Sequence, residues 1–156
     1  MDNVDSNAIM QVALVVKDIM KTAEYYSKIF GMEFPLIRDI PFENEIIARY
    51  RGEKLQAKAK LCVFRMGCIA LELIQPVDDC PSSWREFLEM HGQGVHHVGV
   101  AVNDKNSALK VFEDYGINPR HEGVFSSGSE YTIVDSEEKL GVMWNIKQLP
   151  GSIAIG

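Results

Sequence analysis

The feature that most constrains this chain is a segment that it contains twice. Residues 11–18 read QVALVVKD and residues 97–104 read HVGVAVND. Each copy opens on a polar side chain, continues as an apolar run rich in β-branched residues and closes on an aspartate, which is the pattern of a buried strand leading into a helix. The repeat predicts an internal duplication, with a site between its two halves.

A helix is expected after each copy. Asp18 and Asp104 are its predicted N-caps, and Gly31 and Gly116 its predicted C-terminal stops. The helix faces expected to point inward are marked by apolar residues at helical spacing: Ile19, Ala23, Tyr26 and Phe30 in the first helix, and Ala108, Phe112 and Tyr115 in the second.

A third helix is expected between the halves. Ser83 and Glu86 form a predicted capping box at its start, and Trp84, Phe87 and Leu88 are predicted to face inward. Around it, apolar or alternating runs predict short strands within residues 32–45, 46–50, 57–66, 68–75, 131–134 and 142–148. Residues 123–128 are predicted to form a loop, with His121 solvated.

The last strands of the two halves extend the repeat. Aligning IALELIQ (69–75) with VMWNIKQ (142–148) places Glu72 on Asn145. Together with Gln11 and His97, these are polar residues in strands that otherwise look buried, which is costly unless they bond to one another, to a metal or to a ligand. His96 is expected to point away from His97, because neighbours in a strand face opposite sides.

Three segments carry a family resemblance. QVALVVKDIMKTAEYYSKIFGM, IALELIQP and GVHHVGVAVND resemble the hallmarks of the vicinal-oxygen-chelate superfamily, the glyoxalase and bleomycin-resistance fold, and WREFLEMHGQGVHHVGV is most similar to its methylmalonyl-CoA epimerase-like branch. The resemblance implies a single α+β domain in which two tandem βαβββ modules pair into a curved, cleft-forming sheet. The modules would span residues 9–76 and 96–149, joined by a helical connector at 77–95.

The resemblance also implies a metal site. In that family the first and last strands of each module supply the ligands, and these positions fall on Gln11, Glu72, His97 and Asn145 of this chain. Such a set suggests Zn, Mn, Co, Ni or Fe. The family usually has His at the position of Gln11 and Glu at that of Asn145, and amide oxygens are weaker donors, so metal binding stays open.

Three functions follow from the resemblance. The first is a metal-assisted isomerase, epimerase or lyase that acts alpha to a carbonyl of an acyl-CoA or 2-oxo thioester, with Glu72 as the catalytic base. The alternative is a metal-free protein that binds or sequesters a small molecule. A scaffolding role through dimerisation is the third.

Composition limits the partners and the setting. A net charge of −6 argues against binding to nucleic acid or to anionic membranes. The basic residues between Arg49 and Arg65 could contact coenzyme A phosphates or form a solvated face. Three cysteines without a C-x-x-C pair and an acidic N-terminus suggest a cytoplasmic protein with reduced thiols. The apolar tail 150–156 suits packing on a partner subunit, and we expect a homodimer.

Overall fold

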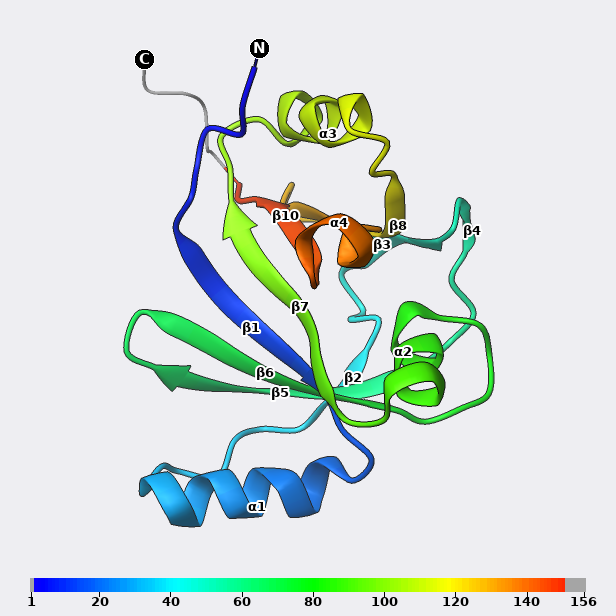
Figure 1. The fold of residues 1–156 in the computed structure, drawn as a ribbon. Helices are drawn as coiled ribbons and strands as arrows, with labels where there is room; N and C mark the ends of the chain where they lie inside the picture. Colours follow the sequence, from blue (N-terminus) through cyan, green and yellow to red (C-terminus); the bar gives the residue numbers. More distant parts are fainter. Residues whose placement is uncertain (1, 151–156) are drawn as a thin grey trace.

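The computed structural model describes residues 2–150, which form a curled ten-stranded sheet with helices packed against it (Figure 1). In chain order the elements are β1 (Ile9–Val15), α1 (Ile19–Phe30), β2 (Arg38–Ile40), β3 (Glu45–Tyr50), β4 (Glu53–Lys54), β5 (Ala59–Met66), β6 (Ile69–Pro76), α2 (Ser83–His91), β7 (Gly94–Ala101), α3 (Lys105–Asp114), β8 (Pro119–Phe125), β9 (Glu130–Val134), α4 (Glu137–Leu140) and β10 (Met143–Gln148).

The duplication is visible in the order of the strands. The sheet runs β2-β5-β6-β1-β7-β10-β9-β8-β3-β4. Outward from the β1–β7 pair, β1, β6, β5 and β2 of the first half mirror β7, β10, β9 and β8 of the second, and the first half adds β3 and β4. β1 and β7 are antiparallel, whereas β6 is parallel to β1 and β10 is parallel to β7. The predicted α+β fold with a curved sheet shared by two halves is therefore confirmed.

The hairpin β3–β4 belongs to the first half of the chain but extends the second half of the sheet. β3 pairs with β8, with Ala48 opposite Gly123 and Tyr50 opposite His121. The predicted strand at residues 46–50 is confirmed, but its partner lies far away in the sequence. This crossing places side chains of β3 on the wall of the central cavity.

Three hydrophobic clusters hold the layers together. The concave side of the sheet packs against α2 through Trp84 and Phe87, and the outer side of the first half packs against α1 through Ile19 and Ala23. The third cluster lies between α3 and the outer side of β7 and β10, around Ala108. Side chains in the regular parts of the strands alternate between the concave and outer faces, as the two-residue period requires.

The two long predicted helices form with the expected N-caps. The side chain of Asp18 accepts a hydrogen bond from the Lys21 amide, and that of Asp104 accepts from the amides of Asn106 and Ser107. Two inward-facing residues were predicted wrongly: Phe30 and Tyr115 are exposed. Phe30 is the last residue of α1, and Tyr115 is the C-cap residue of α3.

Three local predictions are corrected by tertiary contacts. The N-cap of α2 is Ser82 and not Ser83, because the Ser83 hydroxyl is buried against His121. Residues 119–125 form β8, so the predicted loop begins later and His121 is buried in a strand. The alternation within residues 57–66 predicts Val63 on one face with Ala59 and Leu61, and Cys62 on the other with Lys58 and Lys60, but in β5 Cys62 is buried under α1 and Val63 is exposed.

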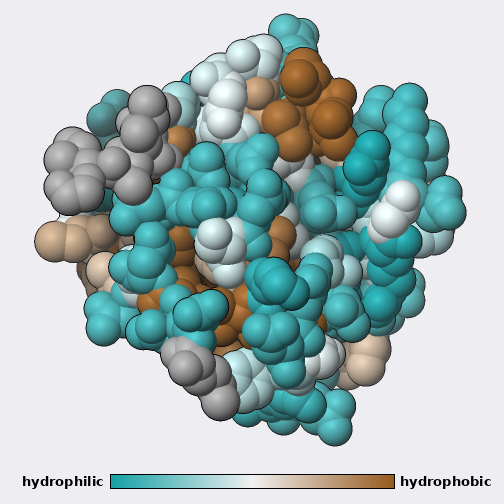
Figure 2. All heavy atoms as spheres, turned by 90° about the horizontal axis from the view of Figure 1, so that it is seen from above, coloured by the Kyte–Doolittle hydropathy of each residue, from teal (hydrophilic) through white to brown (hydrophobic). Residues whose placement is uncertain are grey.

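Polar residues cover most of the face seen from above, with apolar side chains visible between them (Figure 2). Among residues 2–150, none of the helices is long and apolar enough to cross a membrane. The tail 150–156 is predicted to pack on a partner subunit. Its residues 151–156 lie outside the described part of the chain.

Candidate functional site

The four polar residues nominated by the repeat lie together on the concave face of the central strands. Strand register explains why. One row across the sheet carries Glu72, Ala13 and His97 on β6, β1 and β7, and the next carries Gln11, Gly99 and Asn145 on β1, β7 and β10. In each row a small residue separates the polar pair, so side chains two strands apart can meet.

The contact between the Gln11 and Asn145 side chains requires the glycine at position 99. A Cβ atom at Gly99 would lie 2.7 Å from Gln11 Oε1 and 2.9 Å from Gln11 Cβ. Because the position is bare, the Gln11 side chain crosses β7 and its Oε1 comes within 3.4 Å of Asn145 Nδ2. Substituting Gly99 would therefore displace Gln11 without touching the other three polar residues directly.

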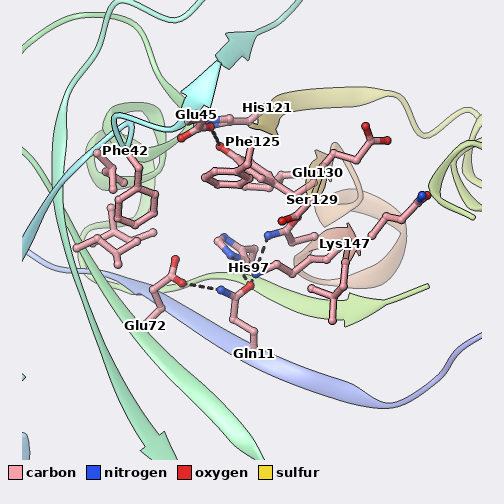
Figure 3. Close-up of a pocket in the computed structure, with 18 of the residues that line it drawn as sticks. Gln11, Phe42, Glu45, Glu72, His97, His121, Phe125, Ser129, Glu130 and Lys147 are labelled. Carbon is pink, nitrogen blue, oxygen red and sulfur yellow. Dashed lines mark hydrogen bonds between the residues drawn. The ribbon is translucent and has the colours of Figure 1, made fainter. Parts of the chain in front are cut away.

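The hydrogen bonds at the site run in one direction. Gln11 Nε2 donates to Glu72 Oε2 at 2.6 Å, which fixes Gln11 Oε1 as the acceptor facing His97 Nε2 at 3.3 Å. His97 therefore carries its proton on Nε2, and its Nδ1 accepts from His96 Nδ1, 2.8 Å away. The chain from His96 through His97 and Gln11 ends on the carboxyl group of Glu72. Figure 3 shows its last three members, His97, Gln11 and Glu72.

Burial dominates the electrostatics of these groups. It raises the pKa of Glu72, opposed by the positive charge of Lys147 and by the hydrogen bond from Gln11. Burial also lowers the pKa of His96 to about 3, and burial together with His96 lowers that of His97 well below its usual value. Both imidazoles are therefore neutral near pH 7, as the directed hydrogen bonds require.

The prediction that His96 points away from His97 is wrong. Ala13 pairs with His97 and Leu14 with Val95, so His96 has no partner on β1 and forms a β-bulge. A bulge interrupts the alternation of side chains. It turns the His96 ring edge-on to that of His97, against Phe87 of α2.

The donor set fits a resident metal poorly. Of the four residues, His97 presents a protonated nitrogen to the centre, and Gln11 Oε1 accepts from two neighbours, so neither is free to ligate a cation. No group of three His, Cys, Asp or Glu side chains in the described chain could hold one. Asn145 Oδ1 is the exception, since it is buried and has no hydrogen-bond partner within residues 2–150.

A second polar cluster lies on the far wall of the same cavity, and sequence reasoning missed it. Tyr131 Oη donates to Glu45 Oε1 at 2.6 Å and lies 3.2 Å from His121 Nε2, while His121 Nδ1 lies 3.0 Å from Ser83 Oγ. Figure 3 shows Glu45 and Glu72 on opposite sides of the pocket. The available signals were His121 and Gly123, two residues apart in the sequence, but the β3–β8 pairing could not be read from the sequence.

The cavity between the two clusters has a volume of about 190 Å³ and a mainly apolar lining, with Phe42, Leu61 and Ile133 among its walls. Pockets that hold drug-sized ligands measure roughly 300–1,000 Å³. The space therefore suits a small group or one end of a larger molecule. Lys147 adds a positive charge to the lining.

The basic residues between Arg49 and Arg65 divide between two places in the strand order, since the β3–β4 hairpin ends one side of the sheet and β5 lies near the other. Arg51 forms ion pairs with Glu86 and Asp135, and Lys60 with Asp39. Part of the positive charge is thus already compensated.

Known proteins with the same architecture include enzymes. The structure is similar to that of methylmalonyl-CoA epimerase from Mycobacterium tuberculosis, with a TM-score of 0.65 at 14% identity over 96% of this chain and 92% of that one. It is also similar to a variant of the Streptomyces coelicolor methylmalonyl-CoA epimerase in complex with 2-nitronate-propionyl-CoA, with a TM-score of 0.62 at 19% identity over 93% and 96% of the two chains. At these identities the likeness shows the fold.

Comparison of the sequence identifies a similar protein and a matching family model. The uncharacterized protein YqjC of Bacillus subtilis (strain 168) is 23% identical over 139 residues, which cover 88% of this chain and 89% of the relative. A family model matches residues 10–133, from β1 to β9. The chain belongs to the glyoxalase/bleomycin resistance protein/dioxygenase superfamily, known from its fold as the vicinal-oxygen-chelate superfamily.

Proposed function

We propose that this protein transfers a proton at the carbon alpha to a carbonyl group of a small acyl ligand, with Glu72 as the base. The observation that carries the proposal is a carboxyl group set into the wall of an apolar cavity and held there by a directed hydrogen-bond chain. Glu72 thus has both the position and the orientation that a proton acceptor needs.

The environment of Glu72 suits this role. Burial raises its pKa, which makes the ionised group a stronger proton acceptor than an exposed carboxylate. Gln11 engages Oε2, and within residues 2–150 no hydrogen bond to Oε1 is found, so this oxygen is available to a ligand. Gln11 and its chain fix the carboxyl plane, so the base is oriented before the ligand arrives.

The negative charge that develops on the ligand also has a partner. Lys147 lines the cavity and acts electrostatically on both Glu72 and His97. A positive charge beside an apolar cavity stabilises an enolate oxygen more strongly than it would in water. We assign this stabilising role to Lys147.

An acyl thioester is the ligand class that we favour. The cavity accommodates the acyl end of such a molecule, and its carrier would remain outside. Support comes from the similar epimerase fold, one example of which is in complex with methylmalonyl-CoA and another with 2-nitronate-propionyl-CoA. Methylmalonyl-CoA is therefore the first compound to test.

No step of the proposed reaction uses a metal ion. A metal-assisted form of the same chemistry would need Gln11 to release His97, after which Glu72, His97 and the amide oxygens of Gln11 and Asn145 would hold the cation. The partnerless Oδ1 of Asn145 favours this second form, and the directed chain disfavours it. Metal content after reconstitution with Zn, Mn, Co, Ni or Fe distinguishes the two.

Deuterium exchange provides the test. Methylmalonyl-CoA is incubated with the protein in D₂O, and label at its alpha carbon is followed by mass spectrometry. We expect exchange with the wild type, a loss of about 10²–10⁴-fold in Glu72→Gln, and no change in Glu89→Gln, which alters an exposed carboxylate on α2. Equal exchange by the wild type and Glu72→Gln would disprove the role of Glu72.

Binding without chemistry is the remaining candidate, and one observation favours it: Gln11, Glu72 and His97 are hydrogen-bonded to one another without any ligand. Calorimetric titration of the same compound decides between them. Saturable binding with no exchange in the wild type would identify a binding protein of this fold and would contradict the proposed proton transfer.

A further inference from the structure

Asn145 of β10 carries a polar atom that the protein itself leaves without a partner. Four buried side-chain nitrogen or oxygen atoms of the described residues have no hydrogen-bond partner, and of these only Asn145 Oδ1 belongs to a residue that lines the cavity. The side chain is buried, with 4% of the residue's surface exposed. Buried polar atoms of native proteins are nearly always hydrogen-bonded, so this oxygen requires a donor from elsewhere.

The orientation of the Asn145 amide is set by Gln11. Gln11 Nε2 donates to Glu72 Oε2 at 2.6 Å, so Gln11 presents its oxygen, an acceptor, to Asn145. Asn145 therefore turns Nδ2 toward Gln11 Oε1, 3.4 Å away, and its own oxygen is left over. Turning the amide round would place two acceptor oxygens against each other. The unpaired atom is thus an acceptor in any arrangement that keeps these hydrogen bonds.

The strands around Asn145 supply no donor. Its register partners are Gly99 on β7 and Ile133 on β9, whose side chains cannot donate a hydrogen bond. Lys147 follows two residues later on β10 and lines the cavity, but its ammonium group forms no hydrogen bond with Asn145 Oδ1. The oxygen is also out of contact with solvent. A donor therefore has to come from a molecule that enters the cavity.

We propose that Asn145 selects acyl ligands that carry a hydrogen-bond donor, a hydroxyl or an ammonium group, on a substituent of the alpha carbon. The inference rests on the proposed function, because it names the class of acyl group on which Glu72 acts. Gln11 links Glu72 to Asn145, so the alpha carbon and the donor lie close together in the ligand. Asn145 determines specificity and takes no part in the proton transfer.

The charges of the cavity lining agree with such a ligand. Glu45, Glu72 and Glu130 line the cavity together with one cationic side chain, that of Lys147. This excess of carboxylates disfavours an anionic ligand group and favours a neutral or cationic one. A ligand carboxylate beside Asn145 Oδ1 would also set acceptor against acceptor, whereas a hydroxyl or ammonium group would pair with it. Methylmalonyl-CoA should therefore bind less tightly than a donor-bearing acyl thioester.

Four coenzyme A thioesters that differ in one substituent of the alpha carbon test the proposal. Isobutyryl-CoA carries a methyl group there, methylmalonyl-CoA a carboxylate, 3-hydroxy-2-methylpropionyl-CoA a hydroxymethyl group and 3-amino-2-methylpropionyl-CoA an aminomethyl group. In calorimetric titrations we expect one or both donor-bearing thioesters to bind about tenfold more tightly than isobutyryl-CoA. The two donor arms distinguish a hydroxyl from an ammonium group. Donor-bearing thioesters that bind no more tightly than isobutyryl-CoA, or methylmalonyl-CoA as the tightest ligand, would overturn the proposal.

Substitution of Asn145 assigns the preference to its oxygen. Asn145→Leu has a similar volume and no acceptor, so the donor-bearing thioesters and isobutyryl-CoA should bind it equally, whereas Asn145→Asp should keep the preference. The ratio of affinities is the readout, because a general loss of stability affects all ligands alike. Asn106→Leu, on the exposed side of α3, is the matched control and should keep the wild-type ratio. A preference that persists in Asn145→Leu would refute the role of Asn145.

Deuterium exchange at the alpha carbon of the same thioesters separates this inference from the proposed function. Exchange catalysed by Glu72 without any preference for donor-bearing ligands would contradict the selection by Asn145 alone. A preference that depends on Asn145, without exchange of any thioester, would contradict proton transfer alone and would support the selection.

Discussion

Single side chains determine which chemistry this member of the superfamily can perform. Gln11 is the central residue, because its amide donates to Glu72 and accepts from His97 and Asn145. An imidazole at this position could not make all three contacts with the same geometry, since its two ring nitrogens point in different directions. The amide thus links the first and last strands of both halves through hydrogen bonds.

Replacing the two amides should create a metal site. In Gln11→His with Asn145→Glu, two strong donors would join Glu72 and His97, and His97 would no longer need to donate to Gln11. We expect the double variant to retain about one Zn or Co ion per chain after dialysis, and the wild type to retain substantially less, by plasma mass spectrometry. Equal retention by both proteins would show that Gln11 and Asn145 do not limit metal binding.

At the level of elements, α2 connects the two halves and fastens them to each other. Its Glu86 lies 2.7 Å from Arg120 Nη2 of β8, and it also pairs with Arg51, just beyond β3. Arg120 is buried and forms a further ion pair with Asp135 at 3.2 Å. Ser83 of the same helix contacts His121, so this helix reaches both the ion pairs and the cavity wall.

Removing the charge of Arg120 should weaken the contact between α2 and β8 and destabilise the fold. Arg120→Met leaves Glu86 and Asp135 without their buried partner, and breaking a buried ion pair costs about 3–5 kcal/mol. We expect the free energy of unfolding to fall by an amount near the lower end of this range, because the two carboxylates are partly exposed. Urea unfolding measures it, with Lys110→Met on the exposed face of α3 as the control. A loss as small as that of the control would contradict the assigned role.

The whole molecule encloses several ionisable groups whose neutral forms are favoured in the fold. His96, His97 and His121 have pKa values lowered mainly by burial, and Glu45 and Glu72 have pKa values raised by burial. The two sets act in opposite directions on stability as the pH changes. As the pH falls, the imidazoles take up protons more readily in the unfolded chain than in the fold, and as the pH rises the carboxyl groups release protons more readily in the unfolded chain.

Acid should therefore destabilise the protein through its histidines. Unfolded histidine protonates below about pH 6.5, but folded His121 does so only near pH 4, so its contribution to stability is lost as the pH falls across that window. We expect the urea midpoint to fall between pH 6.5 and 4, and to fall less steeply in His121→Gln. His91→Gln, which alters a partly exposed ring, is the control. Identical slopes in the wild type and His121→Gln would refute this assignment.

Much of the fold could be predicted because its signals are local. Aspartate caps, apolar periodicity and the repeated strands predicted α1, α3 and the central strands, and the repeat alone brought Gln11, Glu72, His97 and Asn145 to adjacent rows. Errors arose where a residue depends on a distant partner. Ser83 leaves the capping position for His121, and the bulge at His96 arises from pairing with β1.

The sequence by itself determined that the chain consists of two similar halves with a polar site between them, because the repeated strand and its polar residue are properties of short segments. Only the tertiary structure decided that Gln11 is the acceptor of His97 and that β3 brings Glu45 to Tyr131 on the far wall of the cavity. The physical reason is that hydrogen-bond direction and strand pairing depend on partners tens of residues away. Gly99 and Gly123 gain their importance only from side chains that other strands bring across them.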